Sequence, residues 1–314
     1  MPKFSVIIPL YNKEKEFPSS LQSVLAQNFI DFEIIIVNDG STDNSLAIAE
    51  KEALKNQRIK VFSKKNEGLA ATRNFGVNKA IAENVVFIDA DDFWYPFHLE
   101  NLAAILKKFP EAPWFAAAYE KNYNEKLTRK MIAPLNEKNE NFIGKVNFFE
   151  TSLIDSLVHP SSFGMKRDFF LNLGGHNTNI TFSEDTDLWI RAALQTQVAF
   201  SNKISAVINL NSSNRLNHSA MRTRKYPNFD TYEAEAKNNK ALKKYLDVHY
   251  FSIALNYKLA GDTKNFKKYS DKIVKENLNT KQKIILKTPA NILSASKSIK
   301  NFLQKSGIYF SVYK

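Results

Sequence analysis

Two clusters of acidic residues have the types and the spacing to carry out chemistry. Asp89, Asp91 and Asp92 fall within four positions after an apolar segment, and Glu184 and Asp185 are adjacent before another. Carboxylates this close repel one another unless water or a cation neutralises them, and an all-oxygen set suits Mg²⁺ or Mn²⁺ bound to a substrate phosphate. On spacing alone, an acidic turn that caps the next helix explains the first cluster equally well. Its position at the end of a strand favours the metal.

The second acidic cluster allows both a structural and a functional interpretation. Acidic residues stabilise the N-terminus of any helix, so Glu184 and Asp185 predict a helix start. With a substrate nearby, one of the two carboxylates can act as a general base in an enclosed site. His159, His176 and His218 lack the spacing of metal ligands and are interpreted as structural. The chain has 0 Cys, which excludes disulfides, thiolate zinc sites and cysteine nucleophiles.

The elements that must position these residues alternate along the first hundred residues. Strands are predicted at 4–9, 32–37, 59–62 and 85–88, and helices at 16–27, 45–54, 69–81 and 98–107. Unbroken apolar strands separated by helices indicate an α/β fold with a mostly parallel sheet flanked by helices. The carboxyl ends of parallel strands meet at one edge of the sheet, where such folds bind ligands. We therefore expect Asp39 and the first acidic cluster to converge there.

The rest of the chain is less regular. Residues 120–150 are polar and predict a variable excursion, whereas apolar patterns return at 161–165 and 187–194. Further helices are predicted at 232–246, 250–259, 266–274 and 292–303.

Charge divides the chain into two parts. Residues 1–218 carry 24 Lys and Arg against 25 Asp and Glu, whereas residues 219–314 carry 20 against 7. This shift predicts an α/β domain at 1–218 followed by a basic α-helical C-terminal region at 219–314, which can meet an anionic partner. In residues 291–305 an apolar helical stripe edged by lysines predicts attachment to an anionic membrane surface. Packing of that stripe on the first domain is an equally weighted alternative, and no nucleic acid is expected as a partner.

The sequence also predicts where the protein works. No apolar run reaches the roughly 18 to 20 residues that span a bilayer. The apolar stretch at the N-terminus is too short for a signal peptide. We expect a cytoplasmic protein, peripheral at the inner face of the cell membrane if the basic region binds lipid.

Five ordered segments resemble the motifs of family 2 glycosyltransferases with the GT-A fold. They are Pro-Leu-Tyr-Asn at 9–12, Val-Asn-Asp-Gly-Ser-Thr-Asp at 37–43, Asn-Glu-Gly-Leu-Ala-Ala-Thr-Arg-Asn at 66–74, Phe-Ile-Asp-Ala-Asp-Asp at 87–92 and Ser-Glu-Asp-Thr-Asp-Leu-Trp at 183–189. The resemblance covers roughly residues 3–215 and does not extend beyond about 220. It implies transfer of a sugar, with inversion, from a nucleotide-diphosphate sugar to an acceptor hydroxyl.

The resemblance also implies residue roles on the donor side. Asp39 would bind the nucleotide base, and the same pocket would be lined by Pro9, Tyr11, Asn12 and Arg73. A UDP-sugar is the first candidate donor, because most relatives use one.

Three acidic residues would carry the reaction itself. Asp89 would lie near the ribose and the sugar, Asp91 would hold Mg²⁺ or Mn²⁺ on the diphosphate, and Asp185 would be the catalytic base. The Gln-x-x-Arg-Trp motif of processive synthases is absent from the sequence, which favours transfer of one sugar to a glycan or lipid-linked acceptor in cell-surface polysaccharide synthesis. A metal-dependent nucleotidyltransferase or phosphohydrolase is the alternative, and it leaves Asp185 and its motif unexplained.

Overall fold

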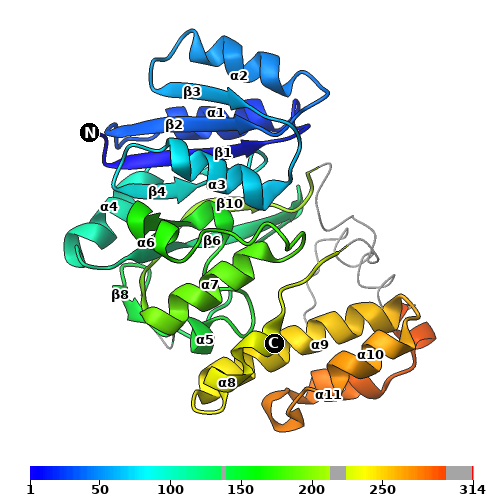
Figure 1. Cartoon of the computed structure of the whole chain (residues 1–314). Coiled ribbons are helices and arrows are strands. Elements are labelled where there is room, and N and C mark those ends of the chain that lie inside the picture. The colour runs from blue at the N-terminus through cyan, green and yellow to red at the C-terminus, as the bar shows by residue number, and fades with distance from the viewer. Residues whose placement is uncertain (136–138, 213–223, 295–312, 314) are drawn as a thin grey trace.

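The computed structural model of the chain describes residues 1–135, 139–212, 224–294 and 313 (Figure 1). Its strands are β1 (Phe4–Leu10), β2 (Phe32–Asn38), β3 (Ile59–Ser63), β4 (Asn84–Phe87), β5 (Phe93–Trp94), β6 (Trp114–Asn124), β7 (Leu127–Lys130), β8 (Ile143–Val146), β9 (Phe163–Lys166) and β10 (Val198–Asn209). Its α-helices are α1 (Phe17–Leu25), α2 (Ser45–Ala53), α3 (Leu69–Lys79), α4 (His98–Lys108), α5 (Phe148–Thr151), α6 (Arg167–Asn172), α7 (Glu184–Gln195), α8 (Glu233–Ala236), α9 (Lys240–Leu259), α10 (Thr263–Ser270) and α11 (Thr280–Lys287).

Within the described ranges the strands form one mixed sheet, in the order β3-β2-β1-β4-β9-β6-β10-β5, with β7 beside β6 and β8 beside β10. Neighbouring strands from β3 through β4 are parallel, as the alternation of strands and helices predicts. The second half adds antiparallel pairs, because β9 runs opposite to both β4 and β6. The predicted α/β fold class, with a central sheet flanked by helices and a helical C-terminal region, is confirmed.

Helices cover both faces of the sheet. Successive residues of a strand point to opposite faces, and all seven residues of β1 are buried, so both faces must be covered. In β1, Phe4 and Val6 pack with the apolar residues of α1 and α4, whereas Ile7 packs on the opposite face with Val77 of α3. Gly76 lets α3 lie directly on β1, because a Cβ there would be 2.5 Å from Cγ2 of Ile7. This close approach brings the middle of α3 to the edge where β1 and β4 end.

Residues 120–150 differ from the excursion that their polar composition predicts. The first of them continue β6 to Asn124, and a tight turn returns the chain through β7, which pairs with β6 through Glu120 and Lys130. Polar residues are compatible with these strands, because the backbone of this part of β6 is paired on both sides, with β7 and with β10.

The C-terminal helices pack on the side of the sheet that α7 covers (Figure 1). Phe148 of α5 lies between Trp189 of α7 and Tyr245 of α9, with ring centroids 6.2 Å and 5.3 Å apart. The helix predicted at 232–246 begins as the separate α8, and its second half joins the helix predicted at 250–259 in one continuous helix from Lys240 to Leu259. Within it the buried Asp247 pairs with Lys243 at 2.9 Å. The division between 1–218 and 219–314 stays a prediction, since residues 213–223 lie outside the described ranges.

Candidate active site

A pocket of about 520 Å³ opens where β1, β2 and β4 end. Its walls include all but one of the site residues predicted from the sequence: Pro9, Tyr11, Asp39, Arg73, Asp89, Asp91 and Asp185. The exception is Asn12, whose side-chain oxygen accepts a hydrogen bond from the backbone N–H of Thr42 at 2.7 Å. Asn12 therefore joins the loop after β1 to the loop after β2.

The acidic turn after β4 has the donor set for a divalent metal ion. Asp89, Asp91 and Asp92 each offer a carboxylate oxygen, and the three oxygens lie within 4.8 Å of one another. Oxygen-only ligands fit Mg²⁺ or Mn²⁺, so the residues suit the predicted ion. Asp91 is the member on which Lys13 Nζ and Ser212 Oγ converge.

Asp92 is buried and anchors the acidic turn through hydrogen bonds. Its carboxylate accepts hydrogen bonds from Ser161 Oγ at 2.5 Å and from the backbone N–H of Asn209 at 2.8 Å. Burial and the neighbouring carboxylates of Asp91 and Asp89 raise the pKa of Asp92 well above its usual range. Asp92 thus fastens the acidic turn to β10 and to the segment before β9.

Asp39 is buried at the end of β2 and organises the loop that leads into α3. Its two carboxylate oxygens accept hydrogen bonds from the backbone N–H groups of Glu67 and Gly68, at 3.0 Å and 2.9 Å, and Lys64 Nζ lies 2.5 Å away. Gly68 has a φ of +89°, a conformation that disfavours residues with a side chain. In this way Asp39 shapes the pocket wall, and its contact with a nucleotide base stays a prediction.

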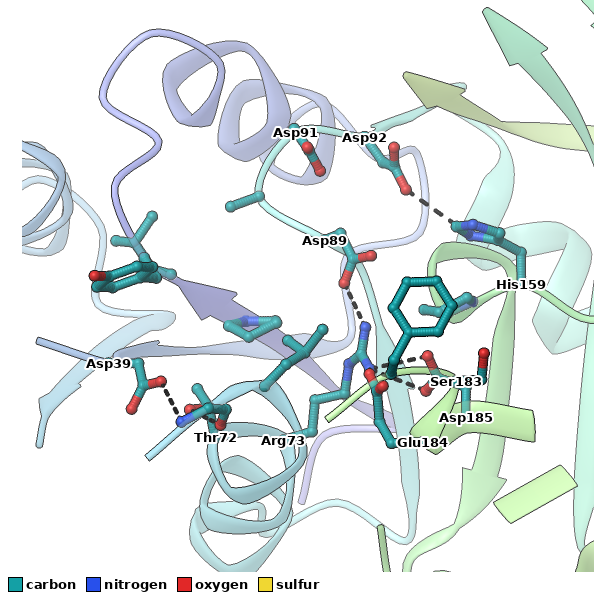
Figure 2. Close-up of a pocket in the computed structure, with 18 of the residues that line it drawn as sticks. Asp39, Thr72, Arg73, Asp89, Asp91, Asp92, His159, Ser183, Glu184 and Asp185 are labelled. Carbon is teal, nitrogen blue, oxygen red and sulfur yellow. Dashed lines mark hydrogen bonds and ion pairs between the residues drawn. The ribbon is translucent and has the colours of Figure 1, made fainter. Parts of the chain in front are cut away.

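Arg73 is the centre of the site and is completely buried (Figure 2). Its guanidinium group lies 2.7 Å from Asp89, 3.1 Å from Glu184 and 2.9 Å from Asp185. Burial alone would lower the pKa of Arg73, but the three carboxylates outweigh it and raise the pKa above its ordinary value. One cation therefore holds the acidic turn after β4 and the first turn of α7 in a fixed relation.

Asp185 enters the pocket from the first turn of α7. The preceding Ser183 has a φ of +64°, which is uncommon for a residue other than glycine and turns the chain sharply into the helix. Burial, reinforced by the charges of Glu184 and Asp89, raises the pKa of Asp185 well above its usual range, although Arg73 opposes the change. A carboxylate with a raised pKa is a stronger base, so this side chain can accept a proton from a bound hydroxyl.

His176, which the sequence interpretation treats as structural, lies beside Asp185 and lines a second pocket. It is buried, its Nδ1 lies 3.6 Å from Asp185, and neither ring nitrogen has a hydrogen-bond partner among the described residues. Its backbone N–H and C=O are both held by the side chain of Asn74, at 2.8 Å each. Burial, together with Arg73 and Arg191, lowers the pKa of His176 well below its usual range, so the ring is neutral.

No spacing rule would have found His176, because it lies nine residues before Asp185 across an irregular turn. Only Gly174 and Gly175 before it, both at positive φ, are a local signal that the chain bends there.

Comparison with known proteins assigns this chain to a family. The sequence pattern of Glycosyl transferase family 2 matches residues 5–174. An uncharacterised glycosyltransferase of Rickettsia conorii is 36% identical over 198 residues, which is 62% of this chain and 31% of that protein. The putative glycosyltransferase EpsH of Bacillus subtilis is 42% identical over 101 residues, which is 32% of this chain and 29% of that protein. The match thus spans about a third of the length of these curated relatives.

Solved structures share the fold at low sequence identity. The S. aureus TarS 1–349 structure in complex with UDP-GlcNAc is 18% identical, with a TM-score of 0.61 over 86% of this chain and 90% of that one. The mannosyltransferase PcManGT from Pyrobaculum calidifontis, in complex with GDP-Man and Mn²⁺, is 18% identical, with a TM-score of 0.53 over 95% of this chain and 75% of that one. With the family pattern over more than half of its length and a GT-A fold around a pocket built from the predicted motifs, the chain belongs to glycosyltransferase family 2.

Proposed function

We propose that the protein is an inverting glycosyltransferase that moves one sugar from a nucleotide-diphosphate sugar, in the first place a UDP-sugar, to a hydroxyl group of a glycan or lipid-linked acceptor in cell-surface polysaccharide synthesis. The observation that carries this proposal is the position of Arg73. Within one pocket it pairs with Asp89, on the donor side, and with Asp185, on the opposite side. The UDP-GlcNAc complex of the similar TarS structure supports the choice of UDP.

The donor would enter along the ends of β1, β2 and β4. Pro9, Tyr11 and Asp39 would line the nucleotide end, and Asp89 would face the ribose and the sugar. A Mg²⁺ or Mn²⁺ ion held by Asp91 would stabilise the negative charge that builds on the diphosphate as it leaves. The Mn²⁺ complex of the similar PcManGT structure supports this cofactor.

The acceptor would enter opposite the diphosphate, where Asp185 can take the proton of its hydroxyl group. The acceptor oxygen then attacks the anomeric carbon as the bond to the diphosphate breaks, which inverts the configuration. The pocket wall also includes Tyr119, His159 and Trp189, of which His159 lies beside Asp92. A nucleotidyltransferase or phosphohydrolase would use the acidic turn alone, and the family match gives that alternative no support.

Divalent metal should strengthen nucleotide binding. We expect UDP to bind about tenfold or more tightly with Mn²⁺ than with EDTA, a difference of at least about 1.4 kcal/mol, because an ion held by the acidic turn would neutralise charge on the diphosphate. Isothermal titration calorimetry on the full chain measures both affinities. Equal UDP affinity in Mn²⁺ and in EDTA would contradict the assigned cofactor.

We also propose that the protein is cytoplasmic and binds an anionic membrane surface, the inner face of the cell membrane. Within the described ranges, no helix combines the length and apolarity that a membrane span requires. The exposed side of α11 carries Lys281, Lys283 and Lys287 around the exposed Ile284. The lysine-edged stripe predicted at 291–305 lies outside the described residues from 295 onward.

We expect salt-sensitive binding to anionic vesicles, because each lysine near such a surface contributes about 1 kcal/mol. Truncation after Thr280 should abolish this binding. Flotation with anionic and with neutral liposomes measures it, and equal recovery with both lipids would favour a C-terminal region that packs on the rest of the protein.

A further inference from the structure

Lys13 forms an ion pair with Asp91, the residue proposed to hold the metal ion. Its ammonium nitrogen lies 2.8 Å from Oδ2 of Asp91, and both side chains are about nine-tenths buried, at 11% and 10% exposed. The loop that carries Lys13 is fixed, because its backbone N–H donates a hydrogen bond to Ser45 Oγ at 2.8 Å. The ion pair therefore belongs to the wall of the pocket and is not a loose surface contact.

The other cations that line the described pocket are engaged elsewhere. Arg73 is held by Asp89, Glu184 and Asp185, and Lys121 lies 2.6 Å from Asp155. Lys13 is the lysine of this pocket that pairs with the acidic turn itself. An entering diphosphate meets a predominantly acidic pocket, so it needs positive charge beside Asp91.

We propose that Lys13 is an exchangeable cation of the donor site. Without a metal its ammonium group neutralises Asp91, and when a divalent ion binds Asp91 the ammonium group moves to the diphosphate of the nucleotide. This inference rests on the proposed function, because it assumes a nucleotide diphosphate in the pocket. It adds a donor-binding residue to the site, and it makes metal and lysine competitors for one carboxylate.

Competition for Asp91 predicts opposite effects on two ligands. A divalent ion must displace the ammonium group, so Lys13 weakens the binding of metal alone. The diphosphate offers the displaced ammonium group a new anionic partner, so Lys13 strengthens nucleotide binding. The two ligands should therefore favour each other, and the coupling must be the same whichever binds first.

The decisive variant is Lys13→Met, which removes the charge and keeps most of the chain length. We expect it to bind Mn²⁺ alone about three- to tenfold more tightly than the wild type, as measured by electron paramagnetic resonance of free Mn²⁺. We expect it to bind UDP in EDTA about tenfold more weakly by calorimetry, because the negative charge of Asp91 is no longer neutralised and repels the diphosphate. Opposite changes in the two affinities support the proposal.

Two further variants separate charge from folding. Lys15→Met removes an exposed lysine from the same loop and should leave both affinities at the wild-type value. Lys13→Arg keeps the charge and should keep Mn²⁺ binding near that of the wild type, even if Lys13→Met lowers the yield of folded protein.

The outcomes distinguish the inference from the function on which it rests. A wild type that binds UDP more tightly with Mn²⁺, together with a Lys13→Met variant that binds Mn²⁺ alone and metal-free UDP as the wild type does, would overturn the exchange and leave the proposed function intact. A wild type that binds neither ligand would overturn the proposed function itself.

Discussion

Asp185→Asn is expected to lower the rate of sugar transfer by about 10² to 10⁴-fold while leaving donor binding close to that of the wild type. The substitution keeps the shape of the side chain and its place beside Arg73, and removes the ability to accept a proton. Steady-state kinetics with a nucleotide sugar and acceptor give the rate, and calorimetry with UDP gives the binding. Wild-type turnover in this variant would remove Asp185 from the mechanism.

A matched control and a pH profile sharpen this test. Asp168→Asn removes an exposed carboxylate from α6, 89% exposed, and should leave the rate unchanged. In the wild type, kcat/KM should fall as pH is lowered through the raised pKa of Asp185, because the protonated side chain cannot accept the proton of the acceptor. This acidic limb should therefore lie at higher pH than the ordinary pKa of an aspartate.

Arg73→Met is expected to lower the free energy of unfolding by about 3–5 kcal/mol. The variant leaves Asp89, Glu184 and Asp185 close together without the cation that neutralises them, and Arg73 is completely buried in the wild type. Urea denaturation of the full chain measures the change. Lys51→Met, at an exposed position on α2, is the control and should change the stability by less than about 0.5 kcal/mol.

Two further measurements attribute this loss to uncompensated charge. The difference between Arg73→Met and the wild type should narrow as pH falls, because protonation of the carboxylates removes the repulsion that the variant creates. Adding Asp185→Asn to Arg73→Met removes one of the three anions and should restore part of the stability, so the two effects are not additive. A deficit that is independent of pH and of Asp185 would mean that Arg73 acts through packing alone.

The first half of the fold follows from local patterns in the sequence. The strands predicted at 4–9, 32–37, 59–62 and 85–88 correspond to β1 through β4 and begin within one residue of the predicted starts. Each is an apolar run between a turn and a helical pattern, so neighbouring residues alone determine it. The convergence of Asp39, Asp89 and Asp91 was also predictable, because the ends of parallel strands must share one edge of the sheet.

The second half depends on partners that are distant in the sequence. β10 pairs with β5, β6 and β8. The end of β6 and the paired β7 are too polar to show a strand pattern. Asp247 is buried in the middle of α9, where it accepts a hydrogen bond at 2.7 Å from the side chain of Asn277, 30 residues away.

Within the site, the sequence by itself determined which residue types are present and the order of their motifs. Only the tertiary structure decided which charges meet. Arg73 reaches Asp89 at a separation of 16 residues and Asp185 at 112, and Lys13 reaches Asp91 at 78. His176 lies beside Asp185, nine residues further along the chain. The physical reason is that a local pattern fixes the hydrogen bonding of a segment and its buried face. Ion pairs depend on side-chain positions that exist only once β1, α3, the turn after β4 and the start of α7 are packed together.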